Sequence, residues 1–251
     1  MPYEDLGSGN NEGMVVILYG KANSGLSTSG YRVLHGDSSI FPGSAEKNDR
    51  FGHSLAVGDI DNDGYDDVVI GIPYEDLGSG GNNNDGNVFI AWGAHYGISN
   101  NGALELHQDK PGVDGRAEKD DRFGYALALG DLNNDGYLDL AVGSPFEDID
   151  GKNDAGKVDV FFGGSGGLST QNSKTFSQKL SAITGSLETD DRFGYSLTTG
   201  DFDGDGASEL VIGSPFEDIG SADNNNEGTV HVLSGDRYNP LSGNDQEVRQ
   251  W

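Results

Sequence analysis

Short apolar runs separated by polar, glycine-rich segments cover most of the chain. Between Phe51 and Gly93, residues 51–59 alternate around small side chains, while 66–73 and 86–93 are compact apolar runs. A weaker fourth run occupies residues 103–108. Short runs of this kind, with glycine-rich punctuation and no sustained period of 3.6 residues, indicate β-strands rather than helices. We therefore expect an all-β protein.

The same four runs, named A to D in chain order, return twice. The first run begins at Phe51, Phe123 and Phe193, which are 72 and 70 residues apart. A period near 70 residues accommodates one antiparallel sheet of four strands with generous loops. Because tandem four-stranded sheets are the blades of a β-propeller, the repeat predicts that fold. Runs 174–180 and 246–251 are the expected D strands of the later copies.

The chain opens inside a blade. Residues 2–20 ("PYEDLGSGNNEGMVVILYG") match residues 73–93, which lead from strand B into strand C, and residues 31–35 are expected to be the D strand. The sequence thus predicts three full four-stranded blades plus the C and D strands of another. The expected divisions are 1–36 for the partial blade and 37–118, 119–187 and 188–251 for the full blades. Additional blades or self-association would be needed to close such a ring, because four blades is the usual minimum.

The connection between strands A and B carries oxygen-bearing side chains at alternate positions. Its first copy reads Asp-Ile-Asp-Asn-Asp-Gly-Tyr-Asp-Asp from Asp59 to Asp67. Oxygen ligands at positions 1, 3 and 5, a glycine at 6, a backbone carbonyl at 7 and an acid at 9 can cage a hard cation such as Ca²⁺. The candidate ligands are Asp59, Asp61, Asp63, Tyr65 and Asp67; Asp131, Asn133, Asp135, Tyr137 and Asp139; and Asp201, Asp203, Asp205, Ala207 and Glu209.

The sequence of this loop allows two other interpretations. An EF-hand has its bidentate Glu at position 12, where this chain has Ile70, Val142 and Ile212. A single loop of this type is equally well explained as an Asx-rich turn. Three copies in one register favour about three bound Ca²⁺ ions, one for each full blade. The third loop differs because Glu209 is one methylene longer than its counterparts.

The composition limits which kinds of partner the chain can bind. The formal net charge is -27, which argues against nucleic acid and anionic membranes because both would repel the chain. The charge favours bound cations or a salty habitat, or it reflects solubility alone. No apolar run reaches the ~18 residues of a membrane span, and no signal peptide is visible in the printed sequence. There is no cysteine, which excludes a disulfide scaffold.

The Phe-Gly start of strand A, the DxDxDGxxD loop and the Gly-x-Pro end of strand B together resemble FG-GAP repeats, the blades of the integrin α-subunit propeller. The resemblance covers nearly the whole chain. It implies a seven-bladed propeller, calcium in the A–B hairpins and an extracellular or cell-surface role in adhesion. Similar blades occur in fungal lectins, in the non-catalytic part of a glycosylphosphatidylinositol-specific phospholipase D and in bacterial surface proteins. The near-identity of the copies and the lack of cysteine favour a bacterial member or fragment.

The expected function is therefore a calcium-stabilised extracellular binding module that recognises a protein or glycan through its B–C and D–A loops. A lectin-like or purely architectural segment of a larger surface protein is the alternative, and a non-catalytic part of a hydrolase is a weaker one. Catalysis is not expected, because the conspicuous carboxylates recur identically in every blade whereas active sites are asymmetric. The "GGSGG" at 163–167 fits a nucleophile elbow only formally, since a strand follows it.

One arginine precedes each Phe-Gly pair, and its role is open to two interpretations. Arg50, Arg122 and Arg192 stand four residues after Glu46, Glu118 and Glu188 respectively. This spacing favours ion pairs that brace the D–A loops. Contacts with a ligand are the alternative.

Overall fold

The computed structural model describes the chain except for residues 7–9, 78–82, 219–225, 236–245 and 250–251. All regular structure in the described part is β-strand. The strands are β1 (Val15–Lys21), β2 (Gly25–Leu34), β3 (Ser54–Gly58), β4 (Asp67–Ile72), β5 (Asn87–Ala91), β6 (Ala103–Leu106), β7 (Ala126–Gly130), β8 (Asp139–Ser144), β9 (Lys157–Phe161), β10 (Lys174–Phe176), β11 (Ser196–Gly200), β12 (Glu209–Ser214), β13 (Thr229–Leu233) and β14 (Gln246–Arg249). The described residues contain no helix with the length and apolar character needed to cross a membrane.

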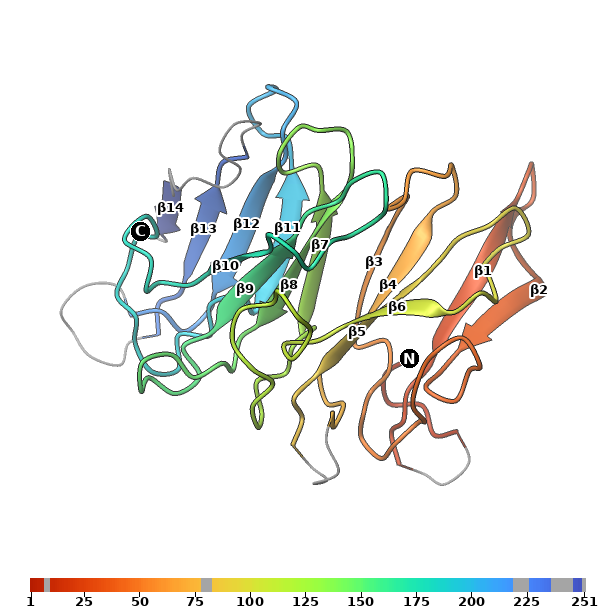
Figure 1. Ribbon diagram of the computed structural model, residues 1–251, viewed down its shortest axis with the longest axis horizontal. Helices are drawn as coiled ribbons and strands as arrows, with labels where there is room; N and C mark the ends of the chain where they lie inside the picture. The colour runs from red at the N-terminus through yellow and green to blue at the C-terminus, as the bar shows by residue number, and fades with distance from the viewer. Residues whose placement is uncertain (7–9, 78–82, 219–225, 236–245, 250–251) are drawn as a thin grey trace.

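The strands form three antiparallel four-stranded meanders and one two-stranded hairpin (Figure 1). The sheets are β3-β4-β5-β6, β7-β8-β9-β10 and β11-β12-β13-β14, each in the order A to D, and β1 pairs with β2. The register repeats: Val57 faces Val68 as Leu129 faces Leu140. These sheets are the blades of a β-propeller, as the sequence predicted.

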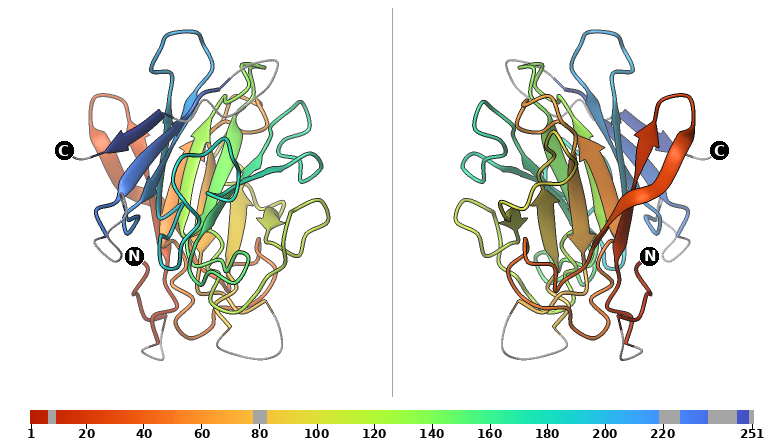
Figure 2. Two further views of the ribbon diagram at one scale, coloured as in Figure 1. Left: turned by 90° about the vertical axis from the view of Figure 1, so that its left-hand side faces the viewer. Right: turned by 90° about the vertical axis from the view of Figure 1, so that its right-hand side faces the viewer.

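The blades stand side by side like the leaves of a fan, from the β1–β2 hairpin on one side to β13 and β14 on the other (Figures 1 and 2). The A strands lie innermost, where β3 contacts β7 and β7 contacts β11. Apolar clusters fill the space between neighbouring sheets, and Phe51, Phe123 and Phe193 lie at most 1% exposed within them. These phenylalanines therefore pack between neighbouring blades.

The B strands are buried on both faces, which explains their β-branched composition. Every residue of β4 and β8 is buried. A strand covered on both sides favours a continuous apolar run over alternation. The small residues Gly71 and Gly143 occur in these runs because a Cβ there would overlap the backbone oxygen of Gly124 or Gly194 in the next blade.

The partial blade differs from its prediction in one respect. Its D strand, β2, begins at Gly25, six residues before the expected start at Tyr31. Without strands A and B beside it, β1 continues to Lys21 and turns directly into β2, so the hairpin is longer than its counterparts in the full blades. A break in register between Ile17 and Tyr19 accommodates the extra length. The expected D strand at 246–251 corresponds to β14, which ends at Arg249. Residues 250–251 lie outside the described part.

Candidate calcium loops and the acidic face

The three A–B loops curl in the same way, held by backbone hydrogen bonds to their own side chains. In the first loop the Asp63 N–H donates to Asp59 Oδ1 (3.0 Å) and Asp61 Oδ1 (3.2 Å), and the Gly64 N–H donates to Asp59 Oδ2 (2.9 Å). The Tyr65 N–H donates to Asp63 Oδ1 (2.9 Å). The side-chain oxygens at positions 1, 3 and 5 are thereby turned toward the interior of the loop.

The second loop reproduces these bonds with an amide at position 3. The Asp135 N–H donates to Asp131 Oδ1 (3.0 Å) and Asn133 Oδ1 (2.9 Å), and the Tyr137 N–H donates to Asp135 Oδ1 (3.0 Å). Because the amide oxygen of Asn133 accepts the same bond as a carboxylate, the exchange preserves the geometry. It removes one negative charge from the ligand set.

The acid at position 9 ties each loop to its sheet. Asp67 accepts the Ile60 N–H (2.9 Å) through Oδ2 and the Gly93 N–H (2.7 Å) through Oδ1. Asp139 accepts the equivalent N–H groups of Leu132 and Gly163 at 2.9 and 2.8 Å. Each carboxylate oxygen keeps a second lone pair, so a buried acid fixed in this way can also bind a cation.

The third loop repeats the turn but differs at position 9. Glu209 accepts the Phe202 N–H (2.8 Å) through Oε2, while its buried Oε1 has no hydrogen-bond partner. Oxygens of Asp201, Asp203 and Glu209 lie within 4.8 Å of one another, as do those of Asp59, Asp61 and Asp67. Convergent carboxylates and an orphaned buried oxygen fit a hard cation, which prefers oxygen ligands and neutralises their charge.

The raised pKa values of several loop acids are consistent with a set of cation ligands. Burial raises the pKa of Asp67, and burial followed by repulsion from Asp63 raises that of Asp61. Burial likewise raises the pKa of Asp139 to about 7, against the opposing effect of the two N–H donors. These three carboxyls therefore resist ionisation in the absence of a cation, chiefly because burial disfavours their charged form.

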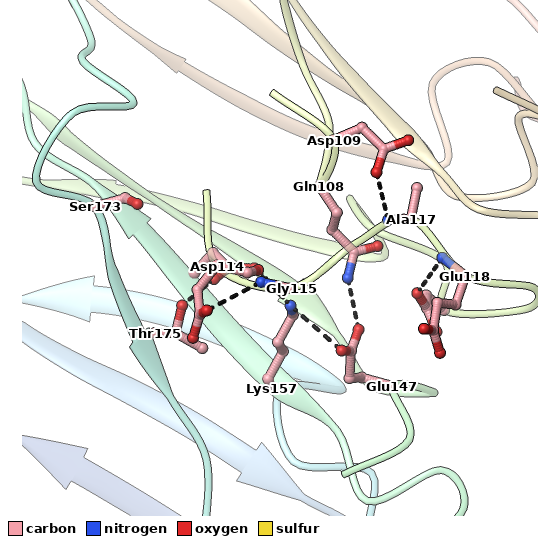
Figure 3. Close-up of polar contacts among 12 residues, drawn as sticks. Gln108, Asp109, Asp114, Gly115, Ala117, Glu118, Glu147, Lys157, Ser173 and Thr175 are labelled. Carbon is pink, nitrogen blue, oxygen red and sulfur yellow. Dashed lines mark hydrogen bonds and ion pairs between the residues drawn. The ribbon is translucent and has the colours of Figure 1, made fainter. Parts of the chain in front are cut away.

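The opposite end of the blades carries a second set of buried charges (Figure 3). Lys157, at the start of β9, is 3% exposed, and its Nζ lies 3.4 Å from Glu147 Oε1 and 3.7 Å from Asp159 Oδ2. It also donates to the Asp114 carbonyl (3.0 Å), and Gln108 Nε2 donates to Glu147 Oε2 (2.6 Å). Burial opposes the charge of Lys157, but Asp159 and Glu147 outweigh it and raise the lysine pKa.

Among the described residues, only the second blade has a lysine at this position. The equivalent residues are Asn87 in the first blade and Thr229 in the third. Buried acids are present in all three: burial raises the pKa of Asp49 and Asp191 to about 7 and that of Asp121 to about 8. The acidic composition thus includes carboxylates held inside the fold, which neither the repeat nor the net charge indicated.

Among the described residues, none of the arginines pairs with Glu46, Glu118 or Glu188, although Arg192 lies 3.8 Å from Asp190 of its D–A loop and 3.7 Å from Asp154. Each guanidinium instead lies between aromatic rings that follow the B strands of neighbouring blades. Arg122 lies over Tyr74 and Phe146, with centroid distances of 5.1 and 4.0 Å. The same arrangement places Arg50 over Tyr3 and Tyr74, and Arg192 over Phe146 and Phe216. These cation–π contacts stack one blade on the next.

The loops predicted to bind a ligand are only partly described. The B–C loop of the second blade, 147–156, is fully described, whereas residues 78–82 and 219–225 of its counterparts lie outside the described part. A depression of about 230 Å³ lies beside the B–C loop of the second blade. It is lined by Asp114, Glu147, Asp150, Lys157 and Lys179. Both charge signs meet there, so it can accept a ligand with polar groups of either kind.

Comparison with known protein families supports the division of the chain into blades. The FG-GAP repeat family matches at residues 51–90, 123–161 and 193–233, one match in each four-stranded sheet. The chain is an FG-GAP repeat protein. Its A–B loops and Phe-Gly pairs are therefore features of a repeat that it shares with other proteins.

Integrin α-subunits are among the relatives. The chain is 35% identical to rat integrin alpha-7 over 216 residues, which is 82% of this chain and 15% of the integrin. It is 28% identical to Drosophila melanogaster integrin alpha-PS2 over 241 residues, 92% of this chain and 15% of that protein. Bovine phosphatidylinositol-glycan-specific phospholipase D is 31% identical over 204 residues, 80% of this chain and 23% of the phospholipase.

The FG-GAP chain thus spans less than a quarter of the length of these curated relatives. The repeat is common to adhesion receptors and to an enzyme, so it indicates a non-catalytic module used in both. The relatives named here are animal proteins, and the expectation of a bacterial source stays a prediction.

Proposed function

We propose that the chain is a calcium-stabilised extracellular binding module, which holds one Ca²⁺ in each A–B hairpin and recognises a protein or glycan on the opposite face. The observation that carries the calcium assignment is the repeated loop geometry. The side-chain oxygens at positions 1, 3 and 5 accept the same backbone bonds in the first two loops. A buried acid closes each loop at position 9.

Two properties support an extracellular setting. Short loops of this kind bind calcium weakly, so extracellular concentrations fill them whereas cytosolic ones do not. The integrin relatives carry the same repeat. In this proposal calcium contributes rigidity: it neutralises the acids that would otherwise repel one another and fixes the hairpins at the end of each blade.

Titration calorimetry on chelator-treated protein tests the metal assignment. We expect about three Ca²⁺ per chain, with Mg²⁺ a poor substitute because it demands stricter octahedral geometry. Asp63→Asn should weaken calcium binding at one site, because it removes one negative charge while keeping an oxygen ligand and the bond from the Tyr65 N–H. Asp66→Asn is the matched control, because Asp66 is exposed in the same loop and stands at position 8, outside the ligand set. Absence of binding at millimolar calcium, or equal loss in both variants, would refute the assignment.

Ligand recognition is assigned to the B–C and D–A loops because they lie at the other end of the rigid sheets, where chain segments differ between blades. A glycan array and a panel of immobilised extracellular proteins, each probed with and without calcium, would identify the ligand class. Neutralising Glu118, Asp150 and Glu188 together should abolish capture while leaving calcium stoichiometry unchanged. Capture that survives this change would contradict the assigned face.

A purely architectural role is the second candidate. The cation–π stack between blades and the buried acids support this candidate, because these groups contact other parts of the fold. Failure of every glycan and protein probe, with calcium binding intact, would favour that role. Capture of glycans but not proteins would instead assign the module as a lectin.

A further inference from the structure

A hollow of about 440 Å³ lies where the loop between β5 and β6 meets the β1–β2 hairpin (Figure 1). The hairpin contributes Tyr19 and residues 30–32, and the loop contributes residues 94–100. The volume falls within the roughly 300–1,000 Å³ of sites for small ligands. Because the loop is a C–D loop, the hollow lies at the end of the blades that carries the A–B loops. It is therefore distinct from the face proposed above for recognition.

Two tyrosine rings are exposed at this hollow. Tyr96 of the loop is 95% exposed, and Tyr31 of β2 is 56% exposed. The Tyr65 hydroxyl of the first A–B loop lies 3.2 Å from His95 Nδ1, and the His95 ring stands edge-on to that of Tyr96 with centroids 4.4 Å apart. The histidine thus supports Tyr96 from one side and leaves most of its ring open to solvent.

Polar groups line the hollow together with these rings. Arg32 Nη2 donates to Asn100 Oδ1 (2.7 Å), and the buried Arg32 Nε has no hydrogen-bond partner among the described residues. A guanidinium carries five N–H donors, and an amide both donates and accepts. The hollow therefore offers flat aromatic surface and hydrogen-bonding groups to the same ligand.

The corresponding place between the first and second full blades lacks these side chains. Strand register and the glycines that follow the C strands align the two places. The positions of Tyr31, Arg32, His95 and Tyr96 are occupied one blade on by Ala103, Leu104, Ser165 and Gly166. Packing of one blade on the next therefore does not require the aromatic and basic set.

The contact beneath the loop is nevertheless the same in both places. Tyr19 lies under Gly97, where an added Cβ would overlap its hydroxyl, and Trp92 is the nearest side chain to an added Cβ on Gly167 (3.6 Å). The second of these contacts joins two blades that each have four strands. A C–D loop seated on the preceding C strand is thus a feature of complete blades, and only the lining of the hollow is particular to the first loop.

We propose that this hollow binds the ring of a neutral hexose within a glycan. The electron-rich faces of the exposed tyrosines attract the weakly positive C–H groups on one face of the sugar ring. Its hydroxyls bond to Arg32 and Asn100, which supply donors and an acceptor. The proposal adds a second recognition site to the module and does not depend on the face formed by the B–C and D–A loops.

Charge selects a neutral sugar over other small ligands. Arg32 is the one lysine or arginine among the described residues that line the hollow, and it repels a cationic group. The formal net charge of -27 repels an acidic sugar as it approaches. A wholly apolar ligand would bury the donors of Arg32 without giving them partners, which costs binding free energy.

Methyl glycosides of glucose, galactose and mannose are the probes, with saturation-transfer NMR on the whole chain as the assay. We expect at least one of them to bind with a Kd of about 1 mM and to receive saturation mainly at its C–H protons. Tyr96→Ala should weaken binding about tenfold, whereas Tyr96→Phe, which keeps the ring, should retain it. Arg32→Leu, which introduces the residue found one blade on, should also weaken binding about tenfold.

The matched control is Phe202→Ala, which removes an aromatic ring that is 65% exposed in the third A–B loop and should leave binding unchanged. Binding should also survive neutralisation of Glu118, Asp150 and Glu188, so this site and the proposed recognition face can fail independently. Absence of saturation transfer to every probe, or equal binding by wild type and Tyr96→Ala, would overturn the proposal. Tighter binding of a glucuronic acid or glucosamine glycoside would overturn the assigned charge, and Tyr96-dependent capture of an extracellular protein without hexose binding would assign the hollow to a protein partner instead.

Discussion

Replacing Lys157 with methionine isolates the buried charge network of the second blade. The substitution keeps most of the side-chain volume and removes the positive charge that lies 3.4 Å from Glu147 and 3.7 Å from Asp159. Asp159 is fully buried and Glu147 largely so, which leaves at least one carboxylate without compensation. Removing one partner of a buried pair typically costs about 3–5 kcal/mol. In a domain of this size 1 kcal/mol corresponds to roughly 2–4 °C of melting temperature.

The loss should depend on pH. At pH 8 the acids around the missing lysine must either ionise without a positive partner or stay protonated at a pH where carboxyls in water are ionised. At pH 5 the buried carboxyls can take up protons, and burial already raises the pKa of Asp121 to about 8. We therefore expect the Lys157→Met variant to lose about 3 kcal/mol at pH 8 and clearly less at pH 5.

Urea unfolding at both pH values measures the effect, with Lys119→Met as control. Lys119 is exposed and lies 3.7 Å from Asp120, so its loss should change stability by less than about 1 kcal/mol at either pH. Lys157→Asn places in the second blade the residue found in the first. A loss that is equal at pH 5 and pH 8, or no larger than in the Lys119 variant, would refute the proposed role of the buried charge.

Two further predictions concern the buried acids and the glycines. The pKa of Asp49, Asp121 and Asp191 is raised from 3.8 to between about 7 and about 8, so the folded state holds these protons more tightly than the unfolded chain. Their stabilisation is complete below pH ~4 and is lost as pH rises through 7 to 8; chemical unfolding in chelator should show this decline, and a rise would contradict it. Gly93→Ala should destabilise the protein whereas Gly20→Ala should not, because only Gly93 is crowded; equal melting temperatures would contradict this.

The sequence was sufficient to predict the blades because each depends on local signals that recur. Phe51 and its copies mark the A strands, and the β-branched runs mark strands buried on both faces. The turn of the A–B loops was also predictable, since the hydrogen bonds within each loop join residues two to seven positions apart. Short-range contacts of this kind follow from spacing alone. The bound cation and the ligand face stay predictions.

The arginines show where this reasoning fails. Glu118 and Arg122 lie four residues apart, a spacing that suggests a local ion pair, but Arg122 adopts a left-handed backbone conformation (φ 56°). That turn points its guanidinium toward Tyr74, 48 residues earlier, and toward Phe146. Contacts between blades join residues about one repeat apart or less, and no local pattern identifies which side chains meet.

Differences between the copies are the better guide to recognition. A residue present in every blade, such as Arg122 or Phe123, performs the same structural task three times. Lys157 has no equivalent lysine in the other blades, and it lies beside a depression that Asp150 and Lys179 also line. A ligand that binds one place on a repetitive scaffold must use what is unique there. The search for ligand contacts should therefore begin at the second blade, where an exposed pair between Lys179 and Asp150 (3.0 Å) can exchange its partner for a ligand at little cost in stability.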